Sequence, residues 1–204
     1  MANIIKESAR GYDRVSPDDV LLSNRIIFLT DEINNSTADE LLKSLMALNA
    51  ESEEEIELYI NSPGGECFSG LAIVDYINIM KAPLRTVCIG TAASMAALIF
   101  LCGDRREMLK HTRLMLHDPS FAGGKSISGM KPHQLQQEVD KLMEVREELA
   151  TIISEVSGKK LDEVYEITKD DSFFTAEQAL EWNLATNIIG QEPKKGKKNE
   201  KISK

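Results

Sequence analysis

The sequence predicts an α/β fold built around a mainly parallel β-sheet, and two observations carry that prediction. Short apolar runs typical of buried strands alternate with amphipathic segments typical of helices between residues 25 and 101. Parallel strands require crossover connections, which are right-handed and mostly helical, so this alternation favours successive βαβ units. With 204 residues and 42% hydrophobic content, the chain is long enough to form one such domain around a substantial core.

The predicted strands and helices follow one another along most of the chain. Aliphatic and β-branched runs predict strands at 25–29, 56–60, 85–89, 107–109, 113–116 and 186–189. Apolar residues at helical spacing predict helices at 37–50, 69–80, 94–101, 132–157, 161–168 and 176–182. Residues 169–174 are interpreted as a connection, and residues 120–130 as a flexible loop or glycine-rich strand.

Local signals define several helix ends. Thr37–Glu40 and Thr175–Gln178 each fit a capping box, in which two side chains satisfy free N–H groups of the first turn. Pro132 suits the first turn of a helix, and Gly158 suits its end. The helix between them is much longer than the mean of about 11–12 residues, and it is apolar along much of its length. We therefore expect it to pack against a neighbouring subunit.

Composition and charge limit the partners and the setting. No apolar run approaches the roughly 20 residues that span a bilayer, and no secretory signal is recognisable, so no membrane association is expected. The cysteines (Cys67, Cys88 and Cys102) lack metal-ligand spacing, which predicts no metal site and a reducing, cytoplasmic location. A net charge of −9 argues against nucleic acid as a partner. Residues 191–204 are rich in lysine and predict a disordered tail, while residues 1–24, with a turn at 17–19, predict a loosely ordered arm.

The stretch from Gly90 to Ala97 places a hydroxyl, that of Ser94, between a predicted strand and a predicted helix. Backbone N–H groups at a helix N-terminus favour negative charge. A serine there can attack a carbonyl while neighbouring amides hold the resulting oxyanion. Serines also cap helices at this position, and for the stretch taken alone capping is the commoner role.

A histidine and a carboxylate occupy comparable positions further along the chain. His117 ends a predicted strand, and Asp171 precedes a predicted helix. Open α/β sheets gather their sites at the carboxyl ends of strands, and serine, histidine and carboxylate supply nucleophile, base and orienter for acyl transfer. The amides of Gly64–Gly65 and Met95 are candidate oxyanion donors. Each residue also has a structural alternative: a packed histidine, a helix-flanking charge, or glycines that only make a turn.

Several blocks of sequence together resemble the proteolytic subunit of the Clp protease family. They are LYINSPGG at 58–65, GTAASMAA at 90–97, RLMLHDP at 113–119 and DSFFTAEQA at 171–179. The resemblance runs from about residue 7 to 189, with the blocks in the family's order.

The resemblance implies a crotonase-like α/β fold and a serine endopeptidase assembled as two stacked heptameric rings around a degradation chamber. It implies Ser94 as nucleophile, His117 as general base and Asp171 as orienter, with the backbone amides of Gly65 and Met95 as the oxyanion hole. Substrates would be unfolded polypeptides delivered by a AAA+ unfoldase ATPase. That partner uses ATP, whereas the peptidase itself needs no cofactor or metal.

The resemblance also implies an organisation for the chain. Residues 1–24 would form the N-terminal arm or axial loop, and residues 25–190 the peptidase domain. Within that domain, residues 120–157 would include the long handle helix that joins the rings. Residues 191–204 would be the lysine-rich tail.

Departures from the family pattern indicate a divergent member. Thr91, Ala96 and Asp118 stand where the family usually has glutamine, glycine and glutamine. The Asp118 carboxylate, directly after the base, is expected either to favour the protonated form of His117 or to help order the handle.

Further departures affect the pocket that docks the ATPase loop in the family. Glu57 and Glu107 replace aromatic residues there, while Tyr59, Val87 and Leu109 still suit an apolar pocket. A second hypothesis is therefore a non-catalytic or regulatory subunit that needs a paralogue in a mixed ring. A third is an acyl-CoA enzyme on the same fold, since a shared fold does not determine function.

Overall fold

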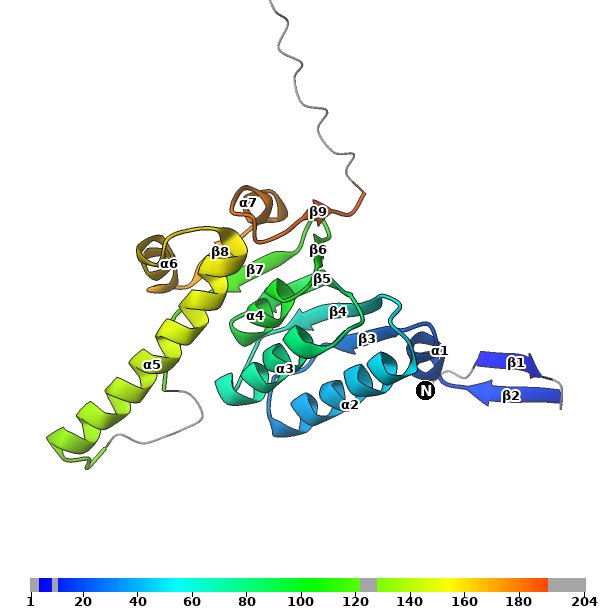
Figure 1. Cartoon of the computed structure of the whole chain (residues 1–204), viewed down its shortest axis with the longest axis horizontal. Helices are drawn as coiled ribbons and strands as arrows, with labels where there is room; N and C mark the ends of the chain where they lie inside the picture. The colour runs from blue at the N-terminus through cyan, green and yellow to red at the C-terminus, as the bar shows by residue number, and fades with distance from the viewer. Residues whose placement is uncertain (1–3, 9–10, 122–127, 191–204) are drawn as a thin grey trace, which may run out of the picture.

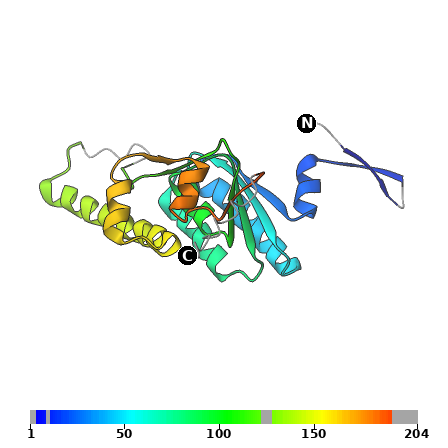
Figure 2. The same cartoon turned by 90° about the horizontal axis from the view of Figure 1, so that it is seen from above.

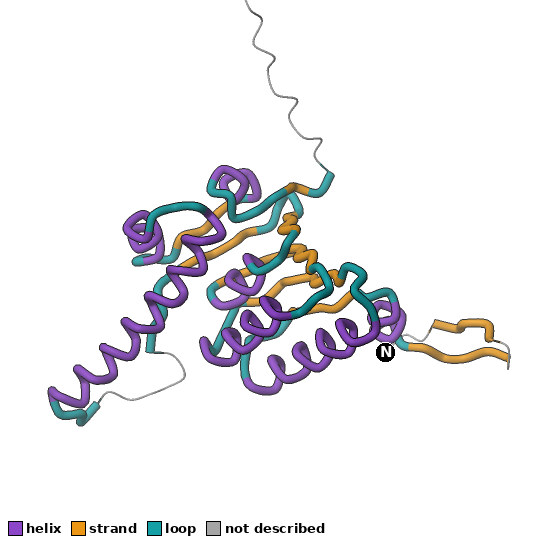
Figure 3. The backbone as a smooth tube through the Cα atoms, in the orientation of Figure 1, coloured by secondary structure: helices purple, strands orange, loops and turns teal. Residues whose placement is uncertain are grey.

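A mainly parallel seven-stranded sheet forms the centre of the structure, a computed structural model that describes residues 4–8, 11–121 and 128–190 (Figures 1 and 3). The strands are β1 Ile4–Ser8, β2 Gly11–Val15, β3 Ile26–Leu29, β4 Ile56–Ser62, β5 Leu84–Ala93, β6 Arg105–Met108, β7 Arg113–Leu116, β8 Ser172–Phe174 and β9 Asn187–Ile188. The helices are α1 Pro17–Ser23, α2 Asn35–Glu51, α3 Cys67–Ile79, α4 Met95–Leu101, α5 Pro132–Ser157, α6 Leu161–Thr168 and α7 Ala176–Glu181.

The sheet branches at its longest strand, β5. The strand order is β3-β4-β5-β6-β9, and all of these neighbours are parallel. The first part of β5 pairs with β6 over Arg85–Cys88, and its last part pairs in parallel with β7 over Thr91–Ala93. Only β8, which is antiparallel to β7, departs from the parallel pattern within this sheet. The predicted α/β fold with a mainly parallel sheet is therefore confirmed.

Helices α2, α3 and α4 lie side by side over one face of the sheet (Figure 1). Leucines at helical spacing on α2, namely Leu41, Leu45 and Leu48, are buried against it. Every residue of α4 is buried, so the helix that follows Ser94 sits inside the core. Burying one such aliphatic side chain contributes about 1.5–3 kcal/mol, so this layer anchors the turn at Ser94 rigidly.

The N-terminus of α2 corrects one prediction. The capping box is not Thr37–Glu40, because the helix begins earlier and Asn34 is its N-cap. The Asn34 side chain accepts hydrogen bonds from the backbone amides of Ser36 (2.9 Å) and Thr37 (3.2 Å). The Thr37 hydroxyl in turn accepts from the Asn34 amide at 3.0 Å. Asparagine caps a helix at least as well as threonine does, so α2 begins at the earlier of the two candidate caps.

Two segments have more regular structure than predicted. The turn predicted at 17–19 is instead the first turn of α1, where Ser16 and Asp19 form a capping box. Before it, β1 and β2 pair antiparallel and project away from the sheet (Figure 2). The connection predicted at 169–174 contains β8, whose few residues show no alternation long enough to be recognised. The predicted tail, 191–204, lies outside the described residues.

Helix α5 has the predicted bounds and ends at Gly158, whose φ of 72° is left-handed. Its buried residues, which begin at Leu149, all lie toward its C-terminal end. The N-terminal half extends beyond the body of the molecule (Figures 1 and 2) and exposes Leu135 (37%), Val139 (37%) and Met143 (52%). None of the helices in the described part of the chain is both long and apolar enough to cross a membrane.

Candidate active site

Ser94 occupies a strained turn between β5 and α4. Its backbone angles, φ 53° and ψ −125°, are rarely adopted by a residue other than glycine, and such strain costs about 1–3 kcal/mol. Its side chain makes no capping hydrogen bond with α4. The hydroxyl Oγ lies instead 2.8 Å from Nε2 of His117. The capping role considered for Ser94 is therefore wrong, and the turn directs the hydroxyl at an imidazole.

Pairing between β5 and β7 brings His117 to the serine. In the parallel register Ala93 lies opposite Met115, and the Ser94 amide donates to the Met115 carbonyl at 2.9 Å. His117 follows Met115 by two residues, so its ring comes from the end of the adjacent strand. The predicted gathering of strand ends at one edge of the sheet accounts for this contact.

Pairing between β7 and β8 places the carboxylate of Asp171 beside His117. The antiparallel register sets Leu116 opposite Ser172. His117, which follows Leu116, therefore faces Asp171, which precedes Ser172. Oδ1 of Asp171 lies 3.5 Å from Nδ1 of His117, and the Asp171 side chain is 65% exposed. That distance suits an ion pair and exceeds a well-formed hydrogen bond. Such contacts commonly shorten when substrate binds.

The paired glycines lie against the turn that holds Ser94. Gly64 and Gly65 have φ values of 89° and 151°, which glycine adopts at little cost. A Cβ on Gly64 would lie 2.8 Å from Cβ of Ser94 and 2.9 Å from the Met95 amide nitrogen. The bridge to Ile33 uses the Gly64 carbonyl and the Glu66 amide, so the Gly65 amide takes no part in it. Met95 begins α4, where the amides of the first turn lack helical partners.

Two residues that support this arrangement were not singled out from the sequence. Oδ1 of Asn61 accepts from the Thr91 amide at 3.0 Å, which ties the end of β4 to the last part of β5. The Ser62 hydroxyl donates to the Asp31 carbonyl at 2.6 Å and accepts from the Gly64 amide at 3.2 Å. Asparagine and serine directly before Pro-Gly-Gly are residues that bond nearby backbone, and that signal was available.

A cleft of about 850 Å³ opens at Ser94. Gly65, Ser94 and His117 line it together with apolar and acidic side chains. The apolar ones include Phe68, Phe121, Leu142 and Val145, and the acidic ones are Glu32 and Glu66. The site therefore has space for an extended segment of a larger substrate.

Cys67 also lines the cleft but is a poor alternative nucleophile. Burial raises the pKa of the Cys67 thiol. Burial likewise raises the pKa of the Cys102 thiol, to about 12. Because the thiolate is the reactive form, such thiols react weakly at neutral pH. In the described ranges, no cluster of histidine, cysteine or acidic residues is arranged to hold a metal ion.

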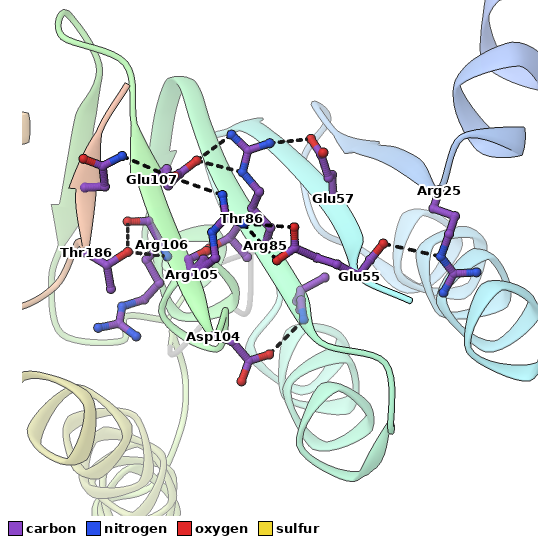
Figure 4. Close-up of polar contacts among 12 residues, drawn as sticks. Arg25, Glu55, Glu57, Arg85, Thr86, Asp104, Arg105, Arg106, Glu107 and Thr186 are labelled. Carbon is purple, nitrogen blue, oxygen red and sulfur yellow. Dashed lines mark hydrogen bonds and ion pairs between the residues drawn. The ribbon is translucent and has the colours of Figure 1, made fainter. Parts of the chain in front are cut away.

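Glu57 and Glu107 belong to an ion-pair network across β4, β5 and β6 (Figure 4). The Arg85 guanidinium donates to both carboxylates at 2.7 Å. Tyr59 donates its hydroxyl to Glu57 at 2.9 Å, and Leu109 is 37% exposed. Val87 is fully buried, so its predicted place in an exposed pocket is wrong. Arg85 therefore pairs with both carboxylates, and Arg105 supplies a second cation 3.5 Å from Glu107.

We expect Arg85→Met to destabilise the fold by about 3 kcal/mol, as in other cases where one partner of a buried ion pair is removed. The Glu107 side chain is only 8% exposed, so its charge loses its main counter-ion. Burial pushes the pKa of Glu107 up, but bonds from Asn187 and Arg85 outweigh it and hold that pKa below 4.5. Because the pKa of Glu107 is lower in the folded than in the unfolded protein, its ionisation stabilises the fold at pH values above its pKa in the unfolded chain. This stabilisation is lost as the pH falls through its pKa in the folded protein.

The difference in free energy of unfolding between wild type and Arg85→Met should therefore be largest at neutral pH. It should shrink in acid, where protonated Glu107 needs no counter-ion; urea titrations at several pH values measure this. Lys43→Met is the control, because its ion pair with Asp39 is exposed and contributes at most about 1 kcal/mol. Equal effects of the two substitutions would contradict the role given to Arg85.

A serine, a histidine and an aspartate converging at the strand ends of a parallel α/β sheet define a protein of the serine hydrolase class. A family model described as Clp protease matches residues 7–192, and the chain belongs to that family.

Curated relatives agree with this family over nearly the whole chain. The ATP-dependent Clp protease proteolytic subunit 1 of Synechococcus sp. (strain CC9902) is 34% identical over 193 residues, covering 93% of this chain and 95% of the relative. Subunit 1 of Prochlorococcus marinus subsp. pastoris is 33% identical over 201 residues, covering 96% and 99%. Subunit 2 of Parasynechococcus marenigrum is 33% identical over 193 residues, covering 93% and 95%.

Proposed function

We propose that this chain is the serine endopeptidase subunit of an ATP-dependent Clp protease and that it cleaves unfolded polypeptides. The observation that carries the proposal is the 2.8 Å contact between Oγ of Ser94 and Nε2 of His117 at a strained strand-to-helix turn. Membership of the Clp protease family and the apolar cleft beside the serine support it.

In the proposed mechanism Ser94 Oγ attacks the scissile carbonyl while Nε2 of His117 accepts its proton. The amides of Gly65 and Met95 stabilise the oxyanion, and Asp171 orients the imidazole through Nδ1. His117 then donates the proton to the leaving amine, which leaves an acyl-enzyme on Ser94. Water, activated by His117, hydrolyses that ester and restores the serine. No step requires a cofactor or metal in this chain.

The experiment that tests this proposal is labelling of the purified protein by a fluorophosphonate, with the modified peptide mapped by mass spectrometry. We expect a single label on Ser94 and hydrolysis of fluorogenic peptides by the same preparation. Native mass, measured in parallel, reports the assembly that is active. A protein of intact fold with neither labelling nor hydrolysis would overturn the proposal.

The proposed assembly is two stacked heptameric rings with a crotonase-like subunit fold, in which α5 is the handle between rings. The exposed apolar side chains on the projecting half of α5 support it, because apolar side chains gathered on one surface commonly mark an interface. Residues 1–24 are proposed as the axial arm and 25–190 as the peptidase domain. The unpaired cysteines support a reducing, cytoplasmic location.

Met143→Asp is expected to shift the native mass from that of two rings to that of one ring or less. Met143 is 52% exposed in the subunit, so an aspartate there leaves the fold intact but places a charge in the proposed contact. Native mass spectrometry measures the result. Lys141→Asp is the control, because it puts the same charge on another face of α5. An unchanged mass for Met143→Asp would remove this face from the ring contact.

A AAA+ unfoldase ATPase is the proposed partner, and the network around Arg85 bears on how it docks. The ion-paired cluster of Glu57, Arg85 and Glu107 is less suited to an apolar loop than aromatic side chains would be.

Two features favour a second candidate function, that of a regulatory subunit in a mixed ring with a paralogue. They are the ion-paired cluster around Arg85 and the 3.5 Å separation between Asp171 and His117. This candidate predicts a homo-oligomer without activity that stimulates the paralogue on mixing.

A further inference from the structure

Asp118, the residue after His117, joins three segments of the structure. Its Oδ2 accepts a hydrogen bond from Nε of Arg146 on α5 at 2.6 Å. Its Oδ1 accepts from the Thr168 hydroxyl at the end of α6, also at 2.6 Å. Its backbone amide donates to the Thr168 carbonyl at 2.5 Å. One residue thus links the end of β7 to both neighbouring helices.

The burial of these contacts makes them stronger than an ordinary surface ion pair. The side chains of Asp118 and Arg146 are 28% and 22% exposed, and Thr168 is buried. The Arg146 guanidinium also lies 4.2 Å from the centre of the Tyr165 ring, which holds it from a second side. Short charge-assisted hydrogen bonds with restricted partners have well-defined geometry.

The position of this cluster relates it to the chemistry. Asp118 adjoins His117, and Thr168 precedes Asp171 by three residues, so the two bonds between Asp118 and Thr168 join the segments that carry base and orienter. The direct contact of His117 with Asp171 is long, and Asp171 is largely exposed, so that contact alone is a weak restraint. The cluster supplies the restraint that this contact lacks.

We propose that Asp118 is a positioning residue, which holds His117 and Asp171 in register by bonding Arg146 and Thr168. This inference rests on the proposed peptidase function. A misplacement of about 1 Å costs on the order of 10²-fold in rate when reacting groups must align, so loosening the cluster lowers turnover. Asp118, Arg146 and Thr168 do not themselves line the cleft, so substrate binding is expected to change much less than turnover.

The test compares the assembled wild-type protein with Asp118→Asn, Arg146→Met and the double variant. We expect each single variant to lower kcat by about 10- to 100-fold with KM within about twofold, and to slow fluorophosphonate labelling in proportion. Because both substitutions break the same interaction, that between Asp118 and Arg146, the double variant should be little worse than either single variant. Lys141→Met, on the same helix, should retain wild-type kcat, because the Lys141 side chain is 69% exposed and its ion pair, with Glu138, lies within α5.

Thr168→Val provides a second route if Asp118→Asn does not assemble, because it removes one hydroxyl at nearly constant volume. A smaller fall in kcat with unchanged KM is expected. Wild-type kcat in Asp118→Asn or in an assembled Thr168→Val, or an additive loss in the double variant, would overturn the positioning role. Failure of the wild type itself to label or cleave would instead refute the proposed peptidase function.

Discussion

Ser94→Ala is expected to abolish peptide hydrolysis and fluorophosphonate labelling while leaving the fold and assembly intact. Losing the nucleophile of a complete triad lowers kcat on the order of 10⁶-fold, because the covalent route is closed and only the oxyanion hole and binding remain. Alanine removes one oxygen, and Ser94 makes no capping bond that the fold would miss. Activity assays and native mass on the same preparation measure both halves of this expectation.

Ser36→Ala is the matched control, since Ser36 is exposed in the first turn of α2 and does not line the cleft at Ser94. It should retain full activity and labelling. Residual turnover in Ser94→Ala within tenfold of wild type would place the nucleophile elsewhere. Loss of assembly in Ser94→Ala alone would show that its hydroxyl has a structural role.

Gly65→Ala is expected to lower kcat by at least about 10²-fold, the cost of losing one oxyanion-hole donor. At φ 151° a Cβ would lie 2.1 Å from the Ile33 carbonyl oxygen, which is backbone and cannot turn aside. The segment must therefore shift, and its amide shifts relative to Ser94. Initial rates on a fluorogenic peptide measure the loss, and thermal unfolding measures the accompanying destabilisation.

Gly158→Ala is the control that distinguishes the general cost of backbone strain from displacement of the Gly65 amide. Gly158 is also left-handed, with φ 72°, but nothing lies within 4 Å of the Cβ that alanine would add. It should lower stability by about 1–2 kcal/mol, the cost of left-handed backbone for alanine, and keep wild-type kcat. If both alanine variants retain activity, the Gly65 amide is not an oxyanion donor.

Elements defined by local signals were predicted well. The bounds of α5 and α6 and of β7 match the structure because proline, glycine and helical periodicity mark them in the sequence itself. The start of α2, helix α1 and strand β8 were missed. The capping bonds of Asn34 and Ser16 extend only a few residues and were overlooked, whereas β8 is a strand only because β7 lies beside it.

At the candidate site, likewise, the residues could be predicted from the sequence and their contacts could not. Ser94, His117 and Asp171 were proposed from their types, their places after strands and a family resemblance. Their contacts depend on two registers, Ala93 opposite Met115 and Leu116 opposite Ser172. A register follows from packing across the whole sheet, and a shift by one residue would turn a side chain to the other face.

Periodicity and residue chemistry are local properties, so the α/β class, the long helix and the chemical types at the candidate site could be predicted without the structure. Long-range packing is what brings Ser94 to His117 instead of letting it cap α4, and what pairs Arg85 with Glu57 and Glu107. It also decided that Asp118 bonds Arg146 and Thr168. These contacts join residues far apart in the chain, and such pairings form only when the sheet and its helices pack together.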